Sequence, residues 1–131
     1  MIKKCENIGI DIDDTITAAP EFFRELTRMF KKANPHLTIH IISSRNDDQG
    51  TMEFTEKELQ ALGMVYDYLY LLPGVPENAP AELDWYQQYI WQKVAYCLKN
   101  DIGVMYENEE KVKELFGKYA PHVIVIDGFK D

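Results

Sequence analysis

The sequence has few cysteines and no long apolar run, and both absences narrow the class of protein. The 131 residues include two cysteines, and Cys5 and Cys97 form neither a Cys-x-x-Cys pair nor a disulfide framework. We therefore expect two reduced thiols, as in a cytoplasmic protein. No apolar run approaches the length of a membrane span, and the first residues lack the long apolar segment of a secretory signal peptide. The sequence thus predicts a cytoplasmic protein with no membrane partner.

Positive charge is scarce as well. The chain has 14 Lys and Arg residues against 22 Asp and Glu residues, which gives a formal net charge of -8. An acidic surface repels nucleic-acid backbones, and the lysine pairs at 3–4 and 31–32 do not make a basic stripe, so a nucleic-acid partner is not expected. A Walker loop and a Gly-x-Gly-x-x-Gly fingerprint are both absent. An acidic protein that binds a phosphate must build a local positive site from a metal ion, a lysine and backbone N–H groups.

Apolar segments that resemble strands alternate with helical patterns along the whole chain. Pro20 suits the first turn of a helix, and Gly63 suits the end of one. This alternation predicts a three-layer, Rossmann-like α/β fold in a single domain, 1–131, whose central parallel sheet of about five strands has helices on both faces. The strands are expected at 7–12, 37–42, 68–72, 102–106 and 122–126, and the helices at 20–33, 51–62, 81–98 and 109–119.

Polar and acidic residues follow the predicted strands, where a parallel α/β sheet binds its ligands. The first strand is followed by Asp11, Asp13 and Asp14, whose carboxylates would repel one another unless a cation neutralised them. Mg²⁺ prefers such oxygen ligands. A carboxylate beside a phosphate ester can act as a nucleophile, and a second carboxylate can protonate the leaving oxygen. The first strand end therefore predicts metal-assisted phosphate chemistry.

The segment from Ile8 to Thr17 closely resembles the first motif of the haloacid dehalogenase-like hydrolases, an apolar strand followed by Asp-x-Asp-x-Thr and an apolar residue. The resemblance implies that Asp11 is the nucleophile and a Mg²⁺ ligand. It also implies that Asp13 is the general acid/base and offers its backbone carbonyl to the metal. Thr15 would belong to the phosphate-binding part of the site, where it helps to fix the turn.

The second and third motifs of that family have counterparts at similar places in this chain. The second is an apolar strand that ends in Ser or Thr, and the segment 39–45 looks like it, with Ser43 as the phosphate-binding residue. The third is a helix lysine that neutralises the nucleophile and the phosphate. Lys93 fits this role best, and Lys99, near a helix end, is the alternative.

The fourth motif departs from the family pattern, which usually places one or two Asp residues after the fourth strand to hold the metal. Glu107 and Asn108 stand there instead. Glu107 keeps the charge but is one methylene longer, whereas Asn108 keeps an oxygen and loses the charge. The resemblance implies that Glu107 joins Asp11 and Asp13 as a metal ligand, with assistance from Asn108 or the glutamates that follow it.

Each candidate residue also has an ordinary structural interpretation. The acidic cluster at 11–14 could cap the next helix, and Ser43 could be a turn serine. Lys93 could be a solvated helix lysine, and Glu107 a charge at a helix N-terminus that the helix dipole favours. Arg45 could contact a substrate or be solvated. The order of the motifs on the predicted elements favours the functional interpretation.

The spacing of the motifs leaves no room for a full cap domain, so the site should be open. A short loop, the aromatic stretch at 85–91 or a second subunit of a homo-oligomer could cover it, although such a stretch is more often core. The leading hypothesis is a Mg²⁺-dependent phosphomonoester hydrolase that acts through an aspartyl-phosphate on a small molecule such as a nucleotide or a sugar phosphate. The alternative is a catalytically degenerate domain of the same fold that binds metal or phosphate in a regulatory role.

Overall fold

The computed structural model describes residues 5–129, and its centre is a five-stranded sheet in the order β3-β2-β1-β4-β5. Every neighbouring pair of strands is parallel, so the predicted α/β architecture with a parallel sheet is confirmed. The strands are β1 (Asn7–Ile10), β2 (Thr38–Asn46), β3 (Tyr68–Leu72), β4 (Val104–Tyr106) and β5 (Ile124–Ile126). The α-helices are α1 (Pro20–Ala33), α2 (Gln49–Ala61), α3 (Trp85–Lys99) and α4 (Glu110–Tyr119).

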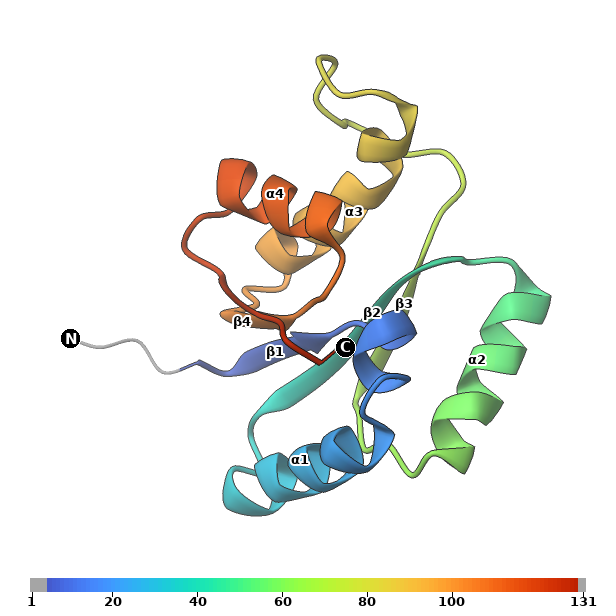
Figure 1. The fold of residues 1–131 in the computed structure, drawn as a ribbon, viewed down its shortest axis with the longest axis vertical. Helices are drawn as coiled ribbons and strands as arrows, with labels where there is room; N and C mark the ends of the chain where they lie inside the picture. The colour runs from blue at the N-terminus through green and yellow to red at the C-terminus, as the bar shows by residue number, and fades with distance from the viewer. Residues whose placement is uncertain (1–4, 130–131) are drawn as a thin grey trace.

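The helices form two layers, with α1 and α2 on one side of the sheet and α3 and α4 on the other (Figure 1). Each layer buries its own apolar cluster against the strands. On the α1/α2 side, Phe23 and Leu59 pack against Ile10 and Ile39. On the α3/α4 side, the cluster includes Ile90, Val94, Cys97, Val112, Leu115 and Phe116, together with Ile42 and Met105 from the sheet.

Most element boundaries agree with the prediction within a few residues, but β2 runs on to Asn46 instead of ending at 42, and α3 begins later than predicted. The helix begins at Trp85 rather than near residue 81 because Asp84 caps it. The Asp84 side chain accepts a hydrogen bond from the Gln87 backbone N–H at 2.8 Å, and the Gln87 side chain accepts one from the Asp84 N–H at 3.0 Å. This reciprocal pair satisfies two backbone donors at the start of α3.

The central strand requires a glycine at its middle. A Cβ atom on Gly9 would lie 2.6 Å from the sulfur of Met105 and 2.9 Å from Cδ1 of Ile42. Gly9 therefore allows β1 to lie between β2 and β4 beneath the α3/α4 cluster.

Both cysteines are free, as expected, and burial raises the pKa of the Cys97 thiol to about 12. No helix in the described part of the chain is long and apolar enough to cross a membrane.

The strand order places a ligand crevice at the carboxyl end of β1. From β1 the chain builds the sheet first toward β2 and β3, and then returns to place β4 and β5 on the other side of β1. Connections diverge to opposite faces at such a point, which leaves a crevice beyond the strand ends. The sequence motifs at the ends of β1, β2 and β4 therefore converge there.

Candidate active site

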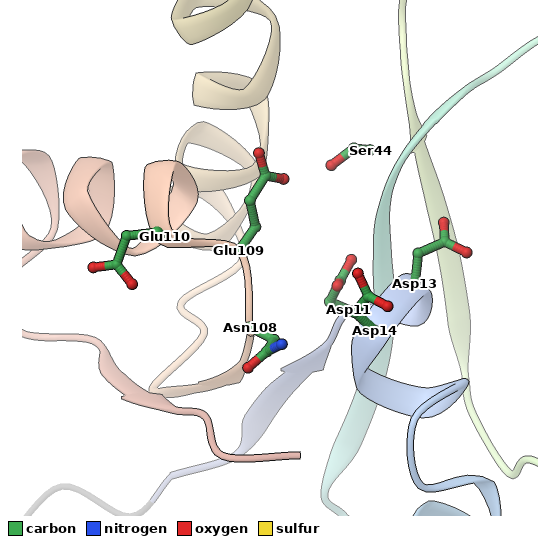
Figure 2. Close-up of a pocket in the computed structure, with 7 residues that line it drawn as sticks. All are labelled: Asp11, Asp13, Asp14, Ser44, Asn108, Glu109 and Glu110. Atoms are coloured by element: carbon green, nitrogen blue, oxygen red, sulfur yellow. The ribbon is translucent and has the colours of Figure 1, made fainter. Parts of the chain in front are cut away.

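A cavity of about 350 Å³ lies beyond the carboxyl ends of β1, β2 and β4 (Figure 2). Five of its lining residues are carboxylates, and no lysine or arginine is among the residues that line it. Such a wall repels an anionic substrate unless a positive charge is supplied from behind or by a bound cation. The lining residues are Asp11, Asp13, Asp14, Ser44, Asn108, Glu109 and Glu110.

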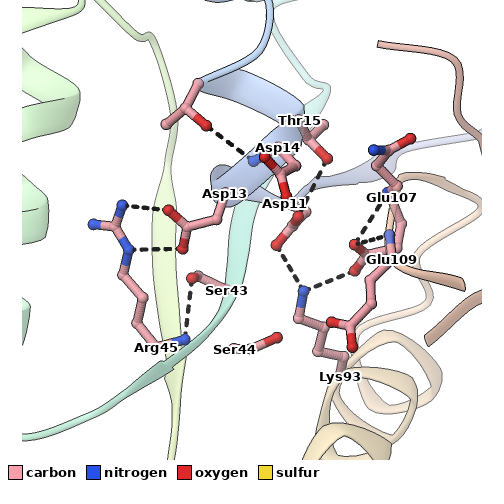
Figure 3. Close-up of polar contacts among 12 residues, drawn as sticks. Asp11, Asp13, Asp14, Thr15, Ser43, Ser44, Arg45, Lys93, Glu107 and Glu109 are labelled. Carbon is pink, nitrogen blue, oxygen red and sulfur yellow. Dashed lines mark hydrogen bonds and ion pairs between the residues drawn. The ribbon is translucent and has the colours of Figure 1, made fainter. Parts of the chain in front are cut away.

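A buried lysine lies between two carboxylates directly behind this cavity. Lys93, in the middle of α3, has a side chain that is 1% exposed, and its Nζ donates to Asp11 Oδ1 and to Glu107 Oε1, both at 2.7 Å (Figure 3). A lysine is almost never fully buried unless it is paired. The structure therefore brings together Asp11, Lys93 and Glu107, which come from three separate segments.

Burial and mutual attraction compete in this cluster. Burial alone would lower the pKa of Lys93, but the carboxylates of Asp11 and Glu107 outweigh it and raise that pKa above its ordinary value. For Glu107, burial raises the pKa to about 7, the Asp11 carboxylate adds to this rise, and Lys93 opposes it. Lys93 thus stays charged and provides the positive charge that the cavity wall itself lacks.

The chain turns sharply after β1, and this turn directs its three aspartates differently. The turn η1 (Ile12–Ile16) contains a left-handed residue, Asp14, with φ 61° and ψ 8°. The Asp14 N–H donates to Thr17 Oγ1 at 2.9 Å, and the buried Thr15 hydroxyl donates to Asp11 Oδ2 at 3.2 Å. Thr15 therefore joins the end of the turn to the Asp11 carboxylate at its start.

The carboxylate of Asp13 points away from Asp11 and toward Arg45 (Figure 3). Arg45 Nη2 lies 2.8 Å from Asp13 Oδ1, and Arg45 Nε lies 3.0 Å from Asp13 Oδ2. The side chain of Arg45 is 14% exposed, so of the two roles that the sequence left open for it, simple solvation is excluded. The sequence does not show this ion pair, because it depends on how the end of β2 lies against the turn after β1.

The end of β2 presents Ser44, rather than the expected Ser43, to the cavity. Ser43 is fully buried, and its Oγ accepts a hydrogen bond from the Arg45 N–H at 3.2 Å. The pairing of β2 with β3 is irregular between Ser43 and Asn46, and such irregularities redirect the side chains around them. Ser44 lines the cavity one residue later in the chain.

The segment after β4 places Asn108, not Glu107, at the cavity wall. Glu107 is fully buried, and its Oε2 accepts hydrogen bonds from the N–H groups of Asn108 at 3.1 Å and Glu109 at 3.3 Å, while Lys93 binds Oε1. Both oxygens of the predicted metal ligand therefore have internal partners. Within residues 5–129, no group of three or more His, Cys, Asp or Glu side chains is arranged to hold a metal ion.

The donors at the cavity nevertheless have the chemistry that a hard cation prefers. Asp11, Asp14 and Asn108 all line the same space, whose wall carboxylates dominate, and the two oxygens of Asp11 also accept from Lys93 and Thr15. Mg²⁺ is bound in proteins by one or two carboxylates together with water, so a cage of protein ligands is not required. The donor set therefore fits Mg²⁺, with Asn108 in the place expected for Glu107.

Two tyrosines of α3 connect the aromatic stretch to the cavity wall. The Tyr89 hydroxyl donates to the Ser44 carbonyl at 2.7 Å, and the Tyr86 hydroxyl donates to the Glu109 carboxylate. Trp85, beside them, is 70% exposed and stacks on Tyr89. The alternative lysine, Lys99, lies instead beside a second cavity between α3 and the loop after β3. Lys93 is therefore the lysine that the fold brings to the site.

Comparison with known proteins adds no identification. No family model matches the sequence, and no curated protein matches it.

Proposed function

We propose that this chain is a Mg²⁺-dependent phosphomonoester hydrolase of the haloacid dehalogenase-like type, which acts through an aspartyl-phosphate on Asp11. The observation that carries the proposal is the buried Lys93, held between Asp11 and Glu107 behind an oxygen-lined cavity. Burying three ionisable groups is expensive, and apolar replacements of such clusters are often neutral or stabilising. A role in chemistry explains why the chain keeps the charges at this place.

In the proposed reaction, a carboxylate oxygen of Asp11 attacks phosphorus while the bond from phosphorus to the leaving oxygen breaks. Asp13 gives its proton to the leaving oxygen, which departs as an alcohol. Asp13 then takes a proton from a water molecule, whose oxygen attacks the phosphorus of the aspartyl-phosphate. Inorganic phosphate leaves, and the carboxylate of Asp11 is restored.

The other residues of the site stabilise the charge that moves during these steps. Lys93 balances the negative charge of Asp11 and of the phosphoryl group nearby. Ser44 lies at the cavity wall, where its hydroxyl can donate to a phosphoryl oxygen. A bound Mg²⁺ would neutralise charge on the transferring phosphoryl group, and Asp11, the Asp13 carbonyl and Asn108 would hold it.

The substrate that we propose is a small phosphate ester, such as a nucleotide or a sugar phosphate, in the cytoplasm. The acidic cavity wall argues against a nucleic-acid partner, because it concentrates part of the formal net charge of -8 at the site itself. A second subunit could cover the open cavity.

A second candidate function is a degenerate domain that binds metal or phosphate without fast turnover. The observation that favours it is the inward orientation of Glu107, since no preformed metal-binding group is found in the described part of the chain. The Thr15 contact to Asp11 weighs against it, because this contact orients a nucleophile for which a binding domain has no use.

The test is phosphate release from an aryl phosphate and from a panel of nucleotide and sugar phosphates, with Mg²⁺ or with EDTA. We expect release that requires Mg²⁺ and is lost in Asp11→Asn, and the panel then ranks the substrates. If the wild type releases no phosphate from any ester, the double variant Glu107→Asp with Asn108→Asp is assayed next. Phosphate release by the double variant would support the degenerate domain, and no release by either protein would contradict the phosphatase proposal.

A further inference from the structure

The carboxylates that line the acidic cavity differ in what balances their charge. Three of them form ion pairs with a lysine or an arginine, namely Asp11 with Lys93, Asp13 with Arg45, and Glu110 with Lys113. Glu109 is different, because its carboxylate accepts from the hydroxyl of Tyr86, which carries no charge. Within residues 5–129, no lysine or arginine forms an ion pair with Glu109. Glu109 therefore adds a negative charge to the cavity wall that no direct cationic partner balances.

Tyr86, in the first turn of α3, holds the Glu109 carboxylate in place. Its hydroxyl donates to Glu109 Oε1, and burial together with this carboxylate raises the pKa of Tyr86 to about 12, so the hydroxyl stays neutral. The Glu109 backbone is fixed as well, since its N–H donates to Glu107 Oε2 at 3.3 Å. Lys111 lies over the face of the Tyr86 ring, with its Nζ 5.3 Å from the ring centroid. Glu109 is thus an ordered, half-buried negative charge.

The Glu109 carboxylate lies on the side of the cavity where Ser44 is found. It points away from Asn108, and the Ser44 side chain points toward the Glu109 side (Figure 2). Tyr89, three residues after Tyr86 on α3, donates to the Ser44 carbonyl at 2.7 Å, so one face of α3 holds both residues. Glu109 is not among the residues that would hold Mg²⁺, so its charge is left to act on the ester itself.

A fixed negative charge at this place distinguishes esters by the charge on their alcohol portion. Every phosphate monoester brings the same phosphoryl group, for which the buried Lys93 provides positive charge. The alcohol portions differ, and a half-buried carboxylate attracts a cation and repels an anion more strongly than a fully solvated one does. The cavity wall includes no lysine or arginine that would bind a second anionic group.

We propose that Glu109, held by Tyr86, is a specificity-determining residue that selects phosphate esters of positively charged alcohols over esters that carry a second anionic group. The inference rests on the proposed phosphatase function and narrows its substrate class. An ammonium group on the alcohol is attracted by the carboxylate, and an uncharged alcohol can donate a hydroxyl hydrogen bond to it. A carboxylate or a second phosphate is repelled, so bisphosphorylated sugars are poor substrates.

The test uses three esters of two-carbon alcohols: phosphoethanolamine, 2-hydroxyethyl phosphate and phosphoglycolate. At pH 7.5 their alcohol portions carry a positive charge, no charge and a negative charge. With Glu109→Gln, measured relative to 2-hydroxyethyl phosphate, we expect kcat/KM to fall for phosphoethanolamine and to rise for phosphoglycolate. The specificity ratio, kcat/KM for phosphoethanolamine divided by that for phosphoglycolate, should fall by about tenfold. Each ester is compared with itself in the wild type, so differences in leaving-group reactivity cancel. Added salt should shrink the effect.

Three further variants separate specificity from structural support. Tyr86→Phe releases the carboxylate while keeping the ring, and it should lower the specificity ratio by a smaller factor. Glu109→Asp keeps the charge and should keep most of the wild-type preference. Glu82→Gln is the matched control, because Glu82 also accepts from a tyrosine hydroxyl, that of Tyr119 at 2.8 Å, and does not line the cavity. It makes the same change in net charge and should leave the specificity ratio unchanged.

The outcomes distinguish this inference from the function on which it rests. If the wild type cleaves the three esters and Glu109→Gln keeps the wild-type specificity ratio, Glu109 does not set specificity and the phosphatase function stands. A ratio that rises in Glu109→Gln would overturn the inference too, as would a wild type that cleaves aryl phosphates but none of the three esters. If the wild type releases phosphate from no ester with Mg²⁺, the proposed function fails and this inference fails with it.

Discussion

Helix α3 contacts two buried polar clusters from positions about one turn apart, and the two are built very differently. Lys93 joins Asp11 and Glu107 near the carboxyl end of the sheet, where every partner is ionisable. Tyr96 donates to or accepts from Nδ1 of His40 at 2.8 Å, and Asn7 Oδ1 lies 3.0 Å from Nε2 of the same ring. The first cluster borders the acidic cavity, whereas the second lies between β1, β2 and α3, where His40 is buried and Tyr96 also lines the second cavity.

The neutral cluster resembles the usual way in which proteins bury polar groups. Both ring nitrogens of His40 have a partner, so the cost of removing them from water is largely compensated. Burial lowers the pKa of His40, and the charge of Asp67 opposes this effect only in part. The charged cluster instead costs several kcal/mol for each buried ion before its attractions are counted. The contrast supports the proposal that the charged cluster serves chemistry at the cavity, whereas the neutral cluster needs no role beyond the fold.

The largest expected effect comes from removing the one cation of the charged cluster. Lys93→Met leaves two carboxylates facing each other in the interior, and at pH 8 we expect a loss of about 3–5 kcal/mol in the free energy of unfolding. The loss should be smaller at pH 6, because burial raises the pKa of Glu107 and the protonated carboxyl no longer repels Asp11. Urea unfolding at the two pH values measures both quantities, and equal losses would contradict the account.

Replacing the whole charged cluster should then restore stability without restoring function. The triple variant Asp11→Asn, Lys93→Met and Glu107→Gln has no buried charge at this place. We expect its free energy of unfolding to lie within about 1 kcal/mol of the wild type or above it, since apolar or neutral substitutes for buried ion clusters are often tolerated. Phosphatase activity should be absent. A triple variant as unstable as Lys93→Met would mean that the cluster is retained for stability.

The matching change in the neutral cluster should be mild. Tyr96→Phe removes one hydrogen bond to His40 and keeps the ring that stacks on Tyr70, at 4.3 Å between ring centroids. We expect a loss of about 1 kcal/mol in the free energy of unfolding, the usual contribution of one hydrogen bond, with activity unchanged. Denaturant unfolding and the phosphate assay check the two parts, and a loss of activity would show that the clusters are coupled.

The smallest effect concerns the pH dependence of the neutral cluster. Because burial lowers the pKa of His40 below its ordinary value of 6.5, the unfolded chain binds a proton that the folded chain does not. The stability that neutral His40 contributes is therefore present above pH 6.5 and is lost as the pH falls below it. His40→Gln should flatten this part of the pH profile when melting is followed from pH 7.5 to pH 5. An unchanged slope would show that His40 does not titrate in this way.

The same comparison shows what could be predicted from sequence. The alternation of apolar segments and helical patterns was sufficient for the parallel sheet. The place of Lys93 within the helix ahead of the fourth strand selected it over Lys99, which is near the helix end and lies away from the site. The start of α3 at Trp85 could also have been predicted, because Asp84 and Gln87 have the spacing of a capping pair.

Other features depend on tertiary placement and could not be predicted. Glu107 faces inward because a buried lysine and two backbone N–H groups bind its oxygens, and nothing local in the sequence specifies this. Ser44 replaces Ser43 at the cavity because the β2–β3 pairing is irregular there. The contact of Arg45 with Asp13 depends on how the end of β2 lies against the turn after β1.

The central claim is that Asp11 carries the phosphoryl group during turnover, and trapping that intermediate tests it most directly. Protein mixed with 4-nitrophenyl phosphate and Mg²⁺ is quenched in acid, digested and analysed by mass spectrometry, using Asp13→Asn to slow the breakdown of the intermediate. We predict that the peptide containing Asp11 becomes heavier by one phosphoryl group, and that Asp11→Asn abolishes this change. A protein that releases phosphate while this peptide stays unmodified, or that is modified at another residue, would contradict the account.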